Sequence, residues 1–74
     1  MATQYQNTLT IGRYIVQESL SVSGTFSIHV EDTEMKKEAL WENLSLEQFD
    51  RLIGLLSYYQ NTDLLGLLEK RKTN

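Results

Sequence analysis

The hydrophobic residues of this chain change their spacing at Ser45, and this change constrains the fold more than any other feature. After Ser45, apolar side chains recur at the spacing of one helix face: Phe49, Leu52, Ile53, Leu56 and Tyr59. Ser45 and Gln48 have the spacing of a capping box, and Leu44 and Phe49 occupy the positions of a hydrophobic staple. The sequence therefore predicts a helix that is capped by Ser45 and ends near residues 60–61.

A leucine-rich segment follows this predicted helix and is expected to form a second one. Thr62 or Asn61 can serve as its N-cap, and the basic residues 70–72 complement the negative end of its dipole. Its apolar residues are Leu64, Leu65, Leu67 and Leu68. They span more of the helix circumference than one narrow core contact requires, so both core packing and a dimer or partner interface remain open.

The first half of the chain has the pattern of a sheet. Residues 8–19 are rich in β-branched and aromatic residues, and apolar side chains alternate with polar ones along residues 20–30. Ser23 and Gly24 form the best turn between these runs, and Gly12 is expected to bend or bulge the first strand. The polar residues 31–37 predict a loop.

Residues 38–44 fit either a short strand or an early helical turn, and we favour a strand with Leu40 on one face and Trp41 on the other. The expected fold is therefore α+β: an antiparallel β-meander of two to three strands followed by two C-terminal helices. Residues 1–74 are expected to form a single domain, with residues 1–7 flexible and residues 70–74 frayed.

Composition argues against an enzyme. A chain of 74 residues holds one thin core and little room for a substrate cleft, which needs roughly 300 Å³ or more. The sequence has no cysteine, and His29 is its only histidine, so nucleophilic catalysis has almost no support. His29, Glu31 and Asp32 form only a weak pattern for metal binding. We expect no catalytic residues, no metal and no cofactor.

The formal charge of −3 and pI of 4.9 argue against direct binding of nucleic acid, which needs a basic surface. The first 30 residues contain one basic residue, Arg13. Seven of the ten acids lie close together in the middle of the chain: Glu31, Asp32, Glu34, Glu38, Glu42, Glu47 and Asp50. Such a segment is either a solvated loop and helix start or a surface that attracts a positively charged partner.

No apolar run approaches the length of a membrane span, and the first eight residues lack the basic and apolar regions of a secretory signal. The sequence therefore predicts a soluble cytoplasmic protein that does not bind membranes.

Three polar residues, Gln17, Glu18 and Ser19, interrupt the apolar run of residues 14–20 (YIVQESL). A strand that carries an acid and a hydroxyl between apolar residues suits a sheet edge that meets a polar, cationic groove. This run resembles the Gln-Glu-Ser strand of the phage uracil-DNA glycosylase inhibitors, which are small acidic proteins that mimic DNA. In that family the strand edge enters the DNA-binding cleft of the enzyme, and an apolar pocket between sheet and helix receives a leucine of the enzyme.

The resemblance covers seven of the 74 residues. It implies a non-enzymatic DNA mimic that inhibits uracil-DNA glycosylase or another DNA-processing enzyme, in the host cytoplasm if the protein is phage-encoded. The expected partner-binding residues are Gln17, Glu18, Ser19, Glu31, Asp32 and Glu34. By position, the expected pocket residues are Phe49, Leu52 and Leu56. The alternative is a small homodimeric regulatory or adaptor protein that binds a protein partner through its leucine-rich C-terminal helix.

Overall fold

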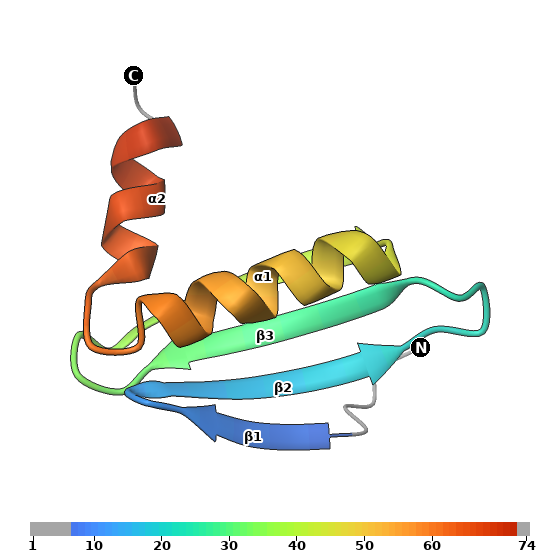
Figure 1. The fold of residues 1–74 in the computed structure, drawn as a ribbon, viewed down its shortest axis with the longest axis horizontal. Coiled ribbons are helices and arrows are strands. Elements are labelled where there is room, and N and C mark those ends of the chain that lie inside the picture. The colour runs from blue at the N-terminus through green and yellow to red at the C-terminus, as the bar shows by residue number, and fades with distance from the viewer. Residues whose placement is uncertain (1–6, 73–74) are drawn as a thin grey trace.

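The computed structural model describes residues 7–72, except for the side chains of residues 71 and 72, and shows a four-stranded antiparallel sheet followed by two helices (Figure 1). The elements are β1 (Asn7–Ile11), β2 (Tyr14–Leu20), β3 (Phe26–Asp32), β4 (Lys37–Leu44), α1 (Leu46–Tyr58) and α2 (Leu64–Lys72). The strands lie in chain order. The predicted α+β class is confirmed. Of residues 1–7, expected to be flexible, and 70–74, expected to be frayed, residues 1–6 and 73–74 lie outside the described residues. Asn7 lies in β1, and residues 70–72 lie in α2.

The predicted number of strands was too low because residues 8–19 form two strands rather than one. Ile11 lies opposite Tyr14, so the chain reverses within the two residues between them, Gly12 and Arg13. Gly12 has a φ of +57°, a conformation that glycine adopts without a steric penalty. Gly12 therefore closes a hairpin between β1 and β2 instead of bending one strand.

The core lies between the sheet and the helices, with α1 across one sheet face (Figure 1). Side chains alternate along each strand, and β2 and β3 each turn apolar residues toward α1. The buried apolar residues are Tyr14, Val16, Ile28, Val30, Leu52, Leu56, Leu64 and Leu65. Leu64 and Leu65 thus belong to the core, whereas Leu67 is 43% exposed. In β4, Leu40 is exposed and Trp41 packs against the core, as the strand interpretation predicted.

Both helices begin at side-chain caps. The predicted capping box of α1 is confirmed: the Gln48 amide donates to Ser45 Oγ (3.2 Å), and the Ser45 amide donates to Gln48 Oε1 (2.9 Å). The cap of α2 differs from the prediction, because the Gly66 amide donates to Asp63 Oδ1 (2.9 Å). Thr62 has another role, since its carbonyl accepts a hydrogen bond from the buried Tyr14 hydroxyl. This hydroxyl in turn accepts from the Leu64 amide and ties β2 to the start of α2.

Gly54 lies in the interior of α1, where a Cβ would meet no atom within 4 Å. Glycine is disfavoured in a helix because its unfolded backbone has more freedom to lose. We expect Gly54→Ala to raise the free energy of unfolding by about 1 kcal/mol in urea denaturation. A variant of unchanged or lower stability would show that this position of α1 needs the glycine.

Candidate functional site

Residues 17–19, which we name the Gln-Glu-Ser step, lie in an interior strand of the sheet. β2 pairs with β1 on one side and with β3 on the other, and Glu18 is opposite Asn7 in β1 and Ile28 in β3. The expectation that these residues form a free sheet edge is therefore wrong. The hairpin at Gly12 places β1 along the side of β2 that the prediction left open.

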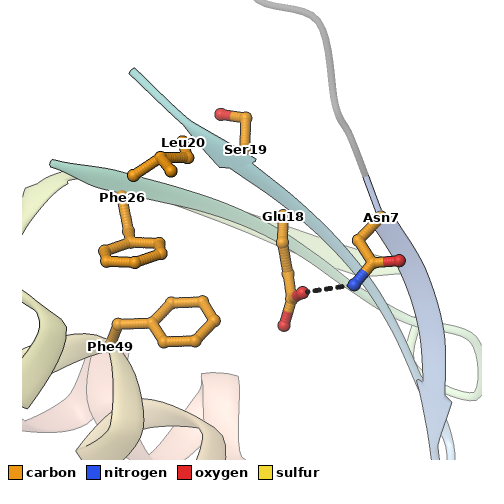
Figure 2. Close-up of a pocket in the computed structure, with 6 residues that line it drawn as sticks. All are labelled: Asn7, Glu18, Ser19, Leu20, Phe26 and Phe49. Carbon is orange, nitrogen blue, oxygen red and sulfur yellow. Dashed lines mark hydrogen bonds between the residues drawn. The ribbon is translucent and has the colours of Figure 1, made fainter. Parts of the chain in front are cut away.

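Strand alternation divides the step between the two sheet faces. Glu18 has the same parity as the buried Tyr14 and Val16, so its side chain points to the face that α1 covers. Gln17 and Ser19 point to the opposite face, and Figure 2 shows the Ser19 side chain directed away from that of Glu18. Ser19 is also only 7% exposed. Of the three residues, Glu18 is the one whose side chain points toward the space between sheet and helix.

Glu18 borders a hollow that lies between the end of β2, the start of β3 and the start of α1. We name it the Glu18 hollow. It has a volume of about 420 Å³. Its lining residues are Asn7, Glu18, Ser19, Leu20, Phe26 and Phe49. The Phe26 and Phe49 rings stack with centroids 4.5 Å apart and an angle of 25° between their planes. In Figure 2 the Phe49 ring extends from α1 toward the Glu18 carboxylate, so an aromatic surface and a charge share one space.

Two neighbouring elements fix the polar and aromatic sides of the Glu18 hollow. The Asn7 amide nitrogen donates to Glu18 Oε1 (3.2 Å), which links the carboxylate to β1 (Figure 2). Phe49 is the fourth residue of α1, directly after the capping box of Ser45 and Gln48. An ionised carboxylate only accepts hydrogen bonds and has about four lone-pair positions, so Glu18 can accept further donors from a partner.

The expected pocket residues fall in two places. Phe49 lines the Glu18 hollow, but Leu52 and Leu56 are 8% and 0% exposed and belong to the core one and two turns further along α1. Sequence reasoning did not assign Asn7 or Phe26 to the site. Phe26 carried a usable signal, because it alternates with Ile28 and Val30 on the core side, but Asn7 depends on the hairpin at Gly12.

The expected acidic loop lies at the other end of β2 from the Glu18 hollow. Tyr14 pairs with Asp32, while Glu18 pairs with Ile28, so four residues of β2, or roughly 13 Å, separate the two places. Glu31 and Glu34 are exposed. The structure therefore does not bring the loop carboxylates and Glu18 into one site.

Asp32 is fully buried and makes structural contacts. Its Oδ1 accepts from Arg13 Nε (2.9 Å) and from the amides of Glu34 (2.9 Å) and Met35 (3.1 Å). These bonds hold the turn between β3 and β4 and join it to the hairpin at Arg13. Asp32 is consequently left out of the partner-binding surface.

Two carboxyl groups of this region make folding sensitive to acid. Burial raises the pKa of Asp32, but hydrogen bonds from Arg13 and from the Met35 and Glu34 amides outweigh burial and lower the pKa overall. The hydrogen bond from the Gly66 amide is the main cause of the lowered pKa of Asp63. Groups with lowered folded pKa values stabilise the fold above the unfolded value of about 3.9, and this contribution is lost as the pH falls through the folded values.

We therefore expect the free energy of unfolding to fall as the pH is lowered below about pH 4. Urea denaturation at a series of pH values between neutral and strongly acidic measures this dependence. Asp63→Asn should show a shallower acid limb, because one of the two responsible carboxyl groups is missing. A pH-independent free energy of unfolding across this range would contradict the assignment.

Within residues 7–72, no group of three His, Asp or Glu side chains is placed to hold a metal ion. The weak pattern of His29, Glu31 and Asp32 is divided between the two sheet faces, because Asp32 points toward the core. His29 Nε2 instead lies 3.3 Å from Glu38 Oε1 on the neighbouring strand.

Comparison with known proteins found no matching family model, and no curated protein or solved structure that matches the chain. None of the helices in the described part of the chain is long and apolar enough to cross a membrane. The geometry of the Glu18 hollow is therefore the main guide to function.

Proposed function

We propose that this chain is a non-enzymatic DNA mimic that inhibits a DNA-processing enzyme, with uracil-DNA glycosylase as the first target to test. One observation carries the proposal: the Glu18 carboxylate borders a hollow walled by the stacked rings of Phe26 and Phe49. DNA-binding clefts present cations to phosphates, and such a cleft can meet the charge and the aromatic surface together. Charge speeds association, while buried apolar surface slows dissociation.

The charges of the sheet support a protein partner over nucleic acid. Arg13 is the one basic residue of the first 30, its side chain is 9% exposed, and its Nε lies 2.9 Å from Asp32 Oδ1. The Arg13 side chain is therefore not available to bind a phosphate. Exposed carboxylates such as Glu31 and Glu34 add to the attraction of a positively charged cleft. On this proposal the protein works in the cytoplasm, that of the host if phage-encoded, without a cofactor and without contact with a membrane.

Inhibition of uracil-DNA glycosylase tests the proposal directly. We expect the wild-type protein to block excision of uracil from an oligonucleotide by the purified bacterial enzyme. We expect Glu18→Ala to weaken inhibition by about 1.5 to 3 kcal/mol, because it removes a charged hydrogen-bond acceptor from the contact.

Glu69→Ala is the matched control for Glu18→Ala. It removes the same charge from an exposed position of α2, away from the residues of the Glu18 hollow, and should inhibit like the wild type. Unchanged uracil excision at a clear stoichiometric excess of the wild-type protein would reject uracil-DNA glycosylase as the target.

A second candidate function is a homodimeric regulatory or adaptor protein. A groove of about 540 Å³ separates β4 from α2. Its lining residues are Glu38, Ala39, Leu40, Trp41, Leu65, Leu68 and Glu69. Leu40 and Leu67 are 50% and 43% exposed, which leaves apolar surface on both elements. Size-exclusion chromatography with light scattering tests this candidate, and a strictly monomeric protein would count against the dimer.

A further inference from the structure

We infer that the Glu18 hollow takes an arginine side chain of the bound protein. The inference rests on the proposed function in treating the occupant as part of a protein, and it adds the side chain that the site recognises. It departs from what the family resemblance implies, which is a leucine in an apolar pocket.

The lining of the Glu18 hollow has an apolar side and an acidic side. Leu20, Phe26 and Phe49 supply the apolar side, and the Glu18 carboxylate, held by Asn7, supplies the acidic one. Arginine has the same two parts, because its methylene stem packs on apolar surface while its guanidinium seeks a carboxylate. The stem would lie on the phenylalanine rings with the guanidinium at Glu18.

A leucine would satisfy only half of this lining. It would displace water from the Glu18 carboxylate without giving that charge a donor, and desolvated charges are costly unless they are paired. A guanidinium supplies both a positive charge and N–H donors at the same place. The position of Glu18 on the helix-covered face therefore favours a basic occupant over an apolar one.

The aromatic wall favours arginine over lysine. A planar guanidinium is weakly hydrated and stacks on aromatic faces, whereas an ammonium is compact and strongly hydrated. The Phe49 ring extends toward Glu18 (Figure 2), so one guanidinium can contact the ring and the carboxylate at once.

The site is assembled before a partner arrives. Phe26 comes from β3, Phe49 is fixed by the capped start of α1, and Asn7 orients Glu18 from β1. Groups held in place by separate elements lose little conformational freedom on binding, which favours recognition of a single side chain.

Capped tripeptides test the inference without any enzyme. Acetyl-Ala-Xaa-Ala-amide, with Xaa as arginine, lysine or leucine, is titrated into ¹⁵N-labelled protein while amide chemical shifts are recorded. We expect the arginine peptide to shift the amides of residues 18–20, Phe26 and Phe49, and to bind more tightly than the lysine peptide. The leucine peptide should bind weakest. The inference is overturned if leucine binds as tightly as arginine, or if the hollow amides do not shift at the highest soluble peptide concentration.

Two variants test the contributions of the Glu18 charge and the Phe49 ring to binding separately. Glu18→Gln keeps the shape of the side chain and should weaken arginine binding about tenfold, because the charge-assisted hydrogen bond is lost. Phe49→Leu keeps an apolar residue at the fourth position of α1 but should abolish the preference for arginine over lysine. Glu69→Gln, which removes a charge elsewhere, should change neither. Equal arginine binding by Glu18→Gln and the wild type would overturn the inference.

The two proposals fail in different ways. Arginine binding in the Glu18 hollow without inhibition of the glycosylase would reject that target and keep the inference. Inhibition by the wild type with no preference for the arginine peptide would keep the proposed function and overturn the inference.

Discussion

Replacing Asp32 with asparagine is expected to lower the free energy of unfolding by about 3 kcal/mol, although the two side chains have nearly the same shape. Asp32 is 0% exposed, and its Oδ1 accepts from Arg13 and from two backbone amides. A neutral amide leaves the poorly exposed Arg13 guanidinium with only the exposed Glu34 carboxylate, 3.8 Å from its Nη1, as an opposing charge. Removing one partner of a buried ion pair is strongly destabilising for this reason.

The second carboxylate oxygen adds to the cost. Asp32 Oδ2 is buried and has no hydrogen-bond partner among the described residues. If asparagine keeps its oxygen at the Oδ1 position, its amide nitrogen occupies the Oδ2 position and becomes a buried donor without an acceptor. An unsatisfied buried polar group costs about 1 to 3 kcal/mol, so this orientation of the amide is unfavourable.

Urea denaturation at neutral pH measures the effect, with Asp50→Asn as the control. Asp50 is an exposed residue of α1, and the same chemical change there should shift stability by no more than about 0.5 kcal/mol. Equal stabilities of the Asp32→Asn and Asp50→Asn variants would show that the pair with Arg13 contributes nothing net. The folded fraction of Asp32→Asn should still inhibit like the wild type, because Asp32 in β3 pairs with Tyr14, at the other end of β2 from Glu18.

Among the local features of the fold, the start of α1 was predicted well and the hairpin at Gly12 was not. The capping box of Ser45 and Gln48 spans four residues, so the start of α1 was readable directly. The hairpin at Gly12 was missed because Gly-Arg is not among the strong two-residue turn sequences such as Asn-Gly. Because no turn was recognised at Gly12, the β-rich residues on both sides of it were predicted as one strand. The Gln-Glu-Ser step was then predicted to lie at a free edge of the sheet.

In the candidate site, too, some features could be predicted from the local sequence and others could not. The direction of Glu18 is readable from alternation, since it shares parity with Tyr14 and Val16, but the prediction of one partner-binding surface did not use this alternation. The burial of Asp32 was not readable, because it depends on Arg13, which is 19 residues earlier in the chain. A carboxylate in a polar loop and one that pairs with a distant arginine have the same local sequence.

Gly12→Ala is expected to destabilise the fold by about 3 kcal/mol, because the position combines two separate obstacles. The backbone at Gly12 has a φ of +57°, which costs an L-residue about 1 to 2 kcal/mol. A Cβ there would also lie 2.5 Å from the Gln60 carbonyl oxygen and 2.5 Å from its Cβ. The first of these atoms is backbone, so relief requires the hairpin and the segment after α1 to separate.

That separation affects more than one contact. The Arg13 amide donates to the Gln60 carbonyl (3.2 Å), and the adjacent Tyr14 hydroxyl donates to the Thr62 carbonyl. Moving the hairpin away therefore weakens the bonds that tie β2 to the connection between α1 and α2.

Gly24→Ala distinguishes the two obstacles. Gly24 also has a positive φ, of +89°, but a Cβ there would meet nothing within 4 Å. This variant should lose only about 1 kcal/mol, the cost of backbone conformation alone. Urea denaturation of both variants at neutral pH gives the comparison. A Gly12→Ala loss no larger than that of Gly24→Ala would mean that the hairpin and Gln60 are not in close contact.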